Sequence, residues 1–135
     1  GQWEEPGWTG YALVKLQECF APHSYGTLAA ALLTGFFRSI WHLPLVIYGG
    51  IAWYDAAFFS FAFQFIIAWL YHKSGKSVPA VMVFHLASNL LTGSMMLQAF
   101  TGGAREMYYI LFVVSACLAA LMIIWQSKFK LGYAP

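Results

Sequence analysis

The chain has 135 residues, of which 61% are hydrophobic and only 9% are charged, whereas a soluble domain carries about 25% charged residues. This composition excludes an ordinary soluble domain and predicts an integral membrane protein. A formal net charge of +2, with no basic stripe along the chain, argues against a nucleic-acid partner.

The apolar stretches of the sequence predict five helices, each bounded by prolines, glycines or polar turns. The expected ranges, in chain order, are about 6–20, 25–43, 51 or 55 to 72, 78–100 and 106–126. The first is short for a full span, which takes about 20 residues. Pro44 is expected to end the second, because the residue before a proline leaves the helical region. We therefore expect an all-α, polytopic transmembrane helical bundle of about five helices, forming one membrane domain over residues 1–135.

The basic residues predict how this bundle is oriented. When the predicted hairpins are traced, Arg105 falls on one side of the membrane, and the other side receives Lys15, Lys73, Lys76, Lys128 and Lys130. Cytoplasmic loops carry an excess of Lys and Arg, so the lysine side and the C-terminus are expected to be cytoplasmic. The chain opens on Gly1, with no Met and no signal peptide. We therefore expect the C-terminal part of a longer protein whose upstream helices are missing.

A small set of polar residues lies in or beside the predicted helices. Glu4 and Glu5 open the first helix, where the helix dipole favours carboxylates and where they could be interfacial charges only. His42, His85 and Asn89 lie within apolar runs. Polar side chains inside a membrane are costly and mark functional sites by default, although His85 and Asn89 could also join helices by hydrogen bonds. Together, these five residues could hold and activate a water molecule.

Connectivity alone predicts which of these residues meet. In an antiparallel hairpin of the first two helices, the two glutamates reach the level of His42, and Thr9 reaches the level of Arg38. His85 and Asn89 share one face of the fourth helix and must approach from there. At a rise of about 1.5 Å per residue, depth counting separates the two histidines by about 10 Å. The site therefore needs tilted helices or a connector that is sunk within the bundle.

Three short motifs carry a resemblance to a known family. They read EEPGWT at 4–9, RSIWHLP at 38–44 and HLASN at 85–89. In this order they resemble the CPBP family of intramembrane proteases, also called Abi or CAAX amino-terminal proteases (type II CAAX prenyl endopeptidases). That family shows Glu-Glu-x-x-x-Arg, then aromatic-x-x-x-His, then His-x-x-x-Asn/Asp. The resemblance covers nearly the whole chain, from Trp3 to about the fifth predicted helix.

The resemblance implies an endopeptidase that hydrolyses a peptide bond with an activated water molecule. Carried over, Glu4 is the general base and His42 its partner, while Glu5 orients the pair or binds substrate. His85 and Asn89 would donate hydrogen bonds to the oxyanion. The implied substrate is a membrane protein or a lipidated, CAAX-type peptide at the lipid bilayer. The implied location is the plasma membrane of a prokaryote.

Two positions depart from the family pattern. Thr9 stands where the family has arginine, and Arg38 stands where the family usually has an aromatic residue. Because the hairpin makes the two positions neighbours, we hypothesise that Arg38 supplies the guanidinium that Thr9 lacks. The competing interpretation is a catalytically inactive member that acts as a membrane scaffold or a bacteriocin-immunity protein. A transporter fragment ranks last, because the sequence shows no internal repeat.

The resemblance leaves metal dependence open, because the family is often described as a metalloprotease. Glu4, His42 and His85 could form a zinc site with an open coordination position. Against zinc, the sequence has no His-Glu-x-x-His helix, and Asn89 would be a poor zinc ligand. A zinc metalloprotease and a glutamate protease without a cofactor are both consistent with the sequence.

Overall fold

The computed structural model describes residues 1–21 and 23–133, apart from the side chains at positions 93, 94, 96 and 97. Its elements, in chain order, are η1 (Gln2–Glu4), α1 (Glu5–Gly7), η2 (Trp8–Leu13), α2 (Val14–Phe20), α3 (Gly26–Trp41), α4 (Leu43–Ile47), η3 (Asp55–Phe59), α5 (Ser60–Lys73), α6 (Val78–Asn89), η4 (Leu90–Met96), α7 (Leu97–Ala99) and α8 (Gly102–Gln126). When elements that adjoin are joined, and α3 is joined to α4 across His42, the described residues make five helical segments and contain no strand. The predicted all-α bundle of about five helices is confirmed.

Local chemistry explains the tight turn between α5 and α6. Gly75 and Lys76 adopt left-handed backbone angles, with φ of 71° and 63°, and this conformation reverses the chain. Ser77 then caps α6, because its side-chain oxygen accepts a hydrogen bond from the backbone N–H of Ala80 at 3.3 Å. Such caps satisfy N–H groups that have no partner at a helix start. The short turn makes α5 and α6 neighbours.

Two of the helix boundaries that differ from the prediction have a local explanation. α3 ends at Trp41, and Pro44 lies in the first turn of the short helix α4. The proline therefore begins a new helix, at a position where its missing N–H costs nothing. α8 begins at Gly102, before the expected start at Glu106. The extended backbone of Thr101, with φ −129° and ψ 159°, forms the N-cap there, and polar residues are well tolerated in a first helical turn.

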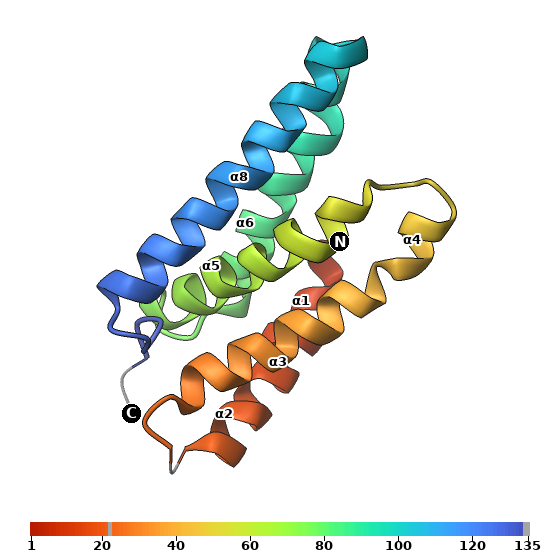
Figure 1. Cartoon of the computed structure of the whole chain (residues 1–135). Helices are drawn as coiled ribbons and strands as arrows, with labels where there is room; N and C mark the ends of the chain where they lie inside the picture. Colours follow the sequence, from red (N-terminus) through yellow and green to blue (C-terminus); the bar gives the residue numbers. More distant parts are fainter. Residues whose placement is uncertain (22, 134–135) are drawn as a thin grey trace.

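α5 is the central helix of the bundle, and it contacts α3, α6 and α8. Figure 1 shows it between α3 on one side and α8 on the other. Its buried face includes Phe63, Gln64 and Ile67. α3 also packs on α2, and Ala30 and Ala31 of α3 are completely buried, since small residues let helices approach closely. This packing brings α1, the end of α3 and the middle of α6 together near the start of α5.

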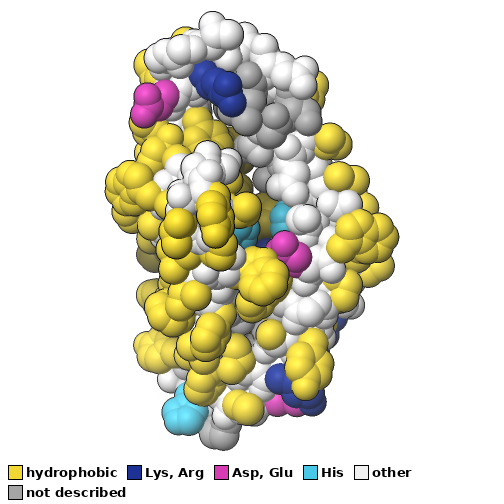
Figure 2. All heavy atoms as spheres, turned by 90° about the vertical axis from the view of Figure 1, so that its right-hand side faces the viewer, with side chains coloured by type: hydrophobic (Ala, Val, Ile, Leu, Met, Phe, Trp, Pro, Cys, Tyr) yellow, Lys and Arg dark blue, Asp and Glu magenta, His cyan; other side chains and the backbone are white. Residues whose placement is uncertain are grey.

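The surface of the bundle is suited to lipid. Two stretches, Gly26–Ile47 and Gly102–Gln126, are long and apolar enough to cross a membrane. Within α8 the buried residues are Val113 and Ala120, so most of its apolar side chains are exposed. Figure 2 shows hydrophobic side chains over much of the visible face. Because large exposed apolar surfaces are rare in soluble monomers, the architecture is that of a membrane helical bundle.

Candidate active site

Glu5 lies at the centre of the candidate active site, with none of its surface exposed. Arg38 donates from Nη1 to Oε1 at 2.9 Å and from Nη2 to Oε2 at 3.2 Å. Thr9 donates from Oγ1 to Oε2 at 2.6 Å, and His85 Nδ1 lies 2.7 Å from Oε1. Because a buried carboxylate is tolerated only when it is paired and hydrogen-bonded, these contacts explain how Glu5 can lie inside the bundle.

These partners of Glu5 come from three different helical segments. Thr9 follows in the π-helical element η2 and bonds back to the residue four positions earlier. Arg38 lies in the last turn of α3, and His85 lies within α6. The hairpin argument predicted that Thr9 and Arg38 are neighbours, and both indeed donate to the same oxygen of Glu5. The carboxylate therefore joins the three segments at one point.

Arg38 is almost completely buried, and its contacts extend beyond Glu5. Its Nε donates to Oε1 of Gln64 at 3.0 Å. Its guanidinium carbon lies 5.7 Å from the centre of the Trp8 ring, within the range of a cation–π contact. Gln64 was not predicted as a site residue, although it is an isolated amide in the apolar run 58–68. That isolation is the signal that could have identified it.

Glu4 differs from Glu5 in its contacts. It is half-buried, and its Oε2 is buried without a hydrogen-bond partner among the described residues. η1, which ends at Glu4, contacts α6. The backbone of Gly1 lies so close to α6 that a Cβ there would be 2.2 Å from Asn89 Nδ2 and 3.3 Å from His85 Nε2. Of the two neighbouring glutamates, Glu4 is thus the one whose carboxylate is not fully committed to protein partners.

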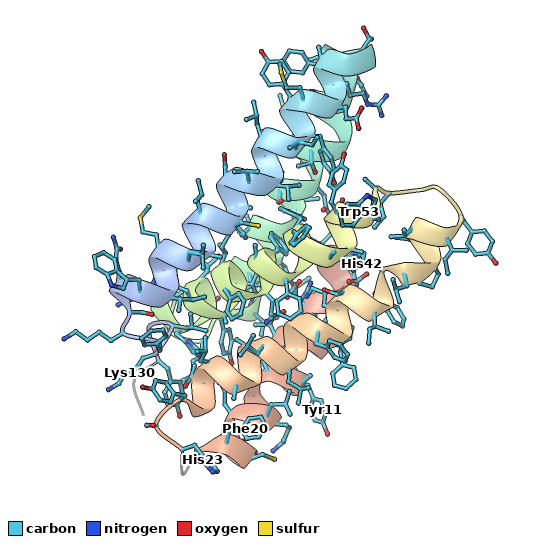
Figure 3. The ribbon with its side chains drawn as sticks, in the orientation of Figure 1. Tyr11, Phe20, His23, His42, Trp53 and Lys130 are labelled. Atoms are coloured by element: carbon cyan, nitrogen blue, oxygen red, sulfur yellow. The ribbon has the colours of Figure 1, made fainter. Side chains whose placement is uncertain are left out.

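His42 follows the last residue of α3 and is half-buried. Figure 3 shows it where α3 passes the beginning of α5. Its Nδ1 lies 2.7 Å from the backbone oxygen of Arg38. A carbonyl oxygen only accepts, so Nδ1 carries the proton, and Nε2 of the neutral ring is left with a lone pair. The imidazole is therefore oriented to accept a proton at Nε2.

A cavity of about 590 Å³ connects the remaining predicted residues. Arg38, His42, His85 and Asn89 all contribute to its lining, and histidine side chains are visible in the hollow at the centre of Figure 2. Depth counting had separated the two histidines by about 10 Å. In the structure both histidines line one cavity, and Gly50 and Ile51 of the connector before η3 line it with them. Glu4 and Glu5 are not among the residues that line this cavity.

The cavity has a second polar wall that the sequence did not indicate. Asp55 at the start of η3 accepts a hydrogen bond from the Tyr109 hydroxyl of α8. Arg105 and Glu106, from the first turns of α8, line the same space. Apolar side chains complete the lining, among them Leu45, Ile51, Phe59 and Phe63. The cavity thus combines polar side chains from α3, η3, α6 and α8 with apolar side chains.

The geometry does not assemble the suggested zinc ligands. Across the described residues, no group of three His, Cys, Asp or Glu side chains is placed to hold a metal ion. The Nδ1 of His85 is occupied by Glu5, whose own oxygens are bound to Arg38 and Thr9. As they are arranged, Glu4, His42 and His85 do not form a zinc site.

The comparison with known proteins agrees with the motifs. A model of the family described as "Type II CAAX prenyl endopeptidase Rce1-like" matches residues 1–91, a range that contains every candidate site residue from Glu4 to Asn89. The chain is also 35% identical, over 98 residues, to "CAAX prenyl protease 2" of Methanococcus maripaludis. That alignment covers 64% of this chain and 34% of the relative, so the chain spans about a third of the relative's length. No solved structure matches the chain significantly. The chain belongs to the Rce1-like family of type II CAAX prenyl endopeptidases.

Proposed function

We propose that this chain carries the catalytic residues of an intramembrane endopeptidase. The observation that supports this most strongly is the division between the two glutamates. Glu5 is fully bound by Arg38, Thr9 and His85, while the buried Oε2 of Glu4 has no partner within the described chain. A carboxylate oxygen that has no hydrogen-bond partner in the described part of the protein, such as Oε2 of Glu4, is suited to accept a proton from water.

The proposed mechanism uses two acceptor atoms, Oε2 of Glu4 and Nε2 of His42, that the hydrogen bonds described above leave without a donor. In the proposed mechanism the Glu4 carboxylate, which does not line the cavity in this structure, turns toward the space that His42 lines. There it takes a proton from water as the water oxygen attacks the carbonyl carbon of the scissile bond. The Nε2 lone pair of His42 accepts a hydrogen bond from the same water and holds it in line. When the tetrahedral intermediate breaks its C–N bond, the proton on Glu4 passes to the leaving amine. This sequence needs only a carboxylate, an imidazole and one water molecule.

The developing oxyanion needs hydrogen-bond donors, and α6 offers two. Asn89 lines the cavity with an amide that can donate directly. His85 donates Nδ1–H to Glu5, because a carboxylate only accepts, so its Nε2 donates to substrate only when the ring carries both protons. Asn89 can therefore donate to the oxyanion whatever the protonation state of His85, and His85 becomes a second donor when its ring is positively charged.

The cavity favours a substrate with an apolar group. Its walls include Leu45, Ile51, Phe59 and Phe63 beside its polar side chains. The relative is named "CAAX prenyl protease 2", and a lipidated peptide would combine an apolar chain with a peptide bond at the bilayer. A CAAX-type or other membrane-associated protein is thus the proposed substrate class.

The test is cleavage by the full-length protein in liposomes, with a prenylated CAAX peptide and a set of transmembrane peptides as substrates. Glu4→Gln removes the proposed base. Glu18→Gln is the matched control, because Glu18 is exposed and pairs with Lys15 at 2.7 Å in α2. Loss of cleavage in Glu4→Gln alone supports the proposal, and a parallel chelator arm decides whether a metal is required. A folded protein that cleaves neither substrate would favour the scaffold or immunity role.

We also propose that the lysine-bearing end of the bundle, with the C-terminus, lies in the cytoplasm of a prokaryotic cell. Lys73 packs on Gly132 and Lys76 lies over Tyr133, so lysines lie beside residues 132–133, and basic residues are enriched at cytoplasmic ends. Cys19, exposed at the end of α2, provides a native probe. An impermeant maleimide should label it only from the cytoplasmic side, and Cys19→Ser is the control.

A further inference from the structure

Gln64 is a buried amide that is only half satisfied. None of its surface is exposed. Its Oε1 accepts the hydrogen bond from Nε of Arg38, while its Nε2 is buried with no partner among the described residues. A buried donor without a partner is unfavourable, and an apolar side chain of similar size would fill the same space without that penalty. What offsets the cost here is the bond to Arg38.

The surroundings of Gln64 direct its amide toward Arg38. A Cβ on Gly35 would lie 3.4 Å from Gln64 Cβ and 3.5 Å from its Cγ, so α3 passes directly over the stem of this side chain. Arg38 follows Gly35 by three residues and so lies on the same face of α3. The glycine thus allows the close approach, and the stem of Gln64 has little freedom to turn its Oε1 elsewhere.

The arginine reaches Glu5 from a different helix than the family pattern provides. An arginine at position 9 would approach from the same helical segment as Glu5, one turn away. Arg38 instead crosses from α3, and its Nε therefore faces α5. A guanidinium has five N–H donors, and in this arrangement Nη1 and Nη2 bond to Glu5 while Nε needs an acceptor. Gln64 supplies that acceptor.

We infer that Gln64 is the positioning residue for the relocated arginine, so that Thr9, Arg38 and Gln64 form one exchangeable unit. In the wild-type chain Gln64 holds Arg38 on Glu5. If the arginine is returned to position 9 and position 38 becomes aromatic, Gln64 loses its donor and leaves a whole amide unpaired. The exchange at positions 9 and 38 then succeeds fully only when position 64 becomes apolar. The activity part of this inference depends on the proposed function.

The test is one substitution in two backgrounds. Gln64→Met is introduced into the wild-type protein and into the Thr9→Arg, Arg38→Phe variant, because methionine has a similar length and no amide. In the wild type it should lower kcat about tenfold, the equivalent of one hydrogen bond to a charged group, with little change in KM. In the exchanged variant it should raise kcat instead. A side chain that only packs would shift both backgrounds in the same direction.

Gln17→Met is the matched control. Gln17 is also buried and hydrogen-bonded, to His72 at 2.9 Å in another part of the bundle, so its loss should affect stability without lowering kcat. If Gln64→Met has wild-type kcat, or if it changes kcat in the same direction in both backgrounds, the inference is wrong. If the exchanged variant does not fold but its Gln64→Met derivative does, the inference is supported. If neither folds, the comparison with Gln17→Met in the wild type decides.

A measurement of stability separates this inference from the proposed function. The melting temperature in detergent should fall with Gln64→Met in the wild type and rise with it in the exchanged variant. A protein that cleaves no substrate would refute the proposed protease activity and still show these opposite shifts. Equal shifts in the two backgrounds would refute the role of Gln64, whatever the protein cleaves.

Discussion

Arg38 and Glu5 form an ion pair with two hydrogen bonds across 33 residues of sequence, and both side chains are almost completely buried. Removing one partner of a buried pair leaves an uncompensated charge, whereas removing both does not. This pair joins α1 to α3. It should therefore be a condition for the assembled site and for the stability of the bundle.

The first prediction concerns that pair. Arg38→Met should lower the free energy of unfolding by about 3 kcal/mol or more, because Glu5 is left buried with its charge unpaired. Adding Glu5→Gln to Arg38→Met should recover a large part of the loss. Reversible unfolding in detergent micelles measures the free energy of unfolding of the single and the double variant. Arg105→Met is the control, since Arg105 is exposed and makes no ion pair within the described chain. If Arg38→Met and this control have the same free energy of unfolding, the prediction is wrong.

The second prediction separates the two glutamates. Glu4→Gln should reduce kcat by a factor of about 10² to 10⁴, the usual contribution of a general base. Its effect on unfolding should be small, because the buried Oε2 of Glu4 has no partner in the described structure. Glu5→Gln should reduce both activity and stability, since it weakens the bonds from Arg38 and Thr9. If Glu4→Gln keeps full activity while Glu5→Gln folds normally and is inactive, the assigned roles are reversed.

The third prediction concerns the oxyanion donor. Asn89→Leu should lower kcat by a factor of about 10² to 10³, as the loss of one oxyanion donor does in other hydrolases. The side chain of Asn89 is exposed to the cavity, so the melting temperature should change little. Thr92→Val serves as the control, because Thr92 lines the same cavity and its hydroxyl donates to the backbone oxygen of Ser88. Equal kcat values for the two variants would argue against Asn89 as the donor.

The fourth prediction concerns the other end of the bundle. His72 bonds through Nδ1 to the backbone oxygen of Leu131 at 2.8 Å and through Nε2 to Gln17 at 2.9 Å, so it holds the C-terminal residues against α5. His72→Phe removes both bonds, each worth about 1 kcal/mol. Of the two bonds, the one to Leu131 holds this segment, so trypsin should cut after Lys128 and Lys130 roughly five times faster, because local opening controls cleavage.

His23→Phe is the control for the trypsin experiment. His23 is exposed in the loop after α2 (Figure 3), and its replacement should leave the cleavage rate unchanged. Peptidase activity should survive His72→Phe, because His72 does not line the cavity that contains His42 and His85. Unchanged proteolysis in His72→Phe would mean that other contacts hold the C-terminal residues.

The sequence by itself determined the class of fold and singled out most of the residues of the proposed site. Scarce charge and long apolar runs can satisfy the backbone inside a bilayer only as helices, so the helical bundle followed directly. Glu4, Glu5, His42, His85 and Asn89 stood out for a related reason, because a polar side chain inside a membrane is costly and seldom incidental. Simple connectivity even made Thr9 and Arg38 neighbours.

Only the tertiary structure decided which of these residues contact one another. Glu4 and Glu5 are adjacent and chemically identical, and they differ in the partners that the folded chain places beside them. Gln64 and the contact between Asp55 and Tyr109 were missed for the same reason, since their roles depend on contacts over long sequence separations. Periodicity and composition describe one segment at a time. The partners of a buried polar group are fixed only when the segments pack.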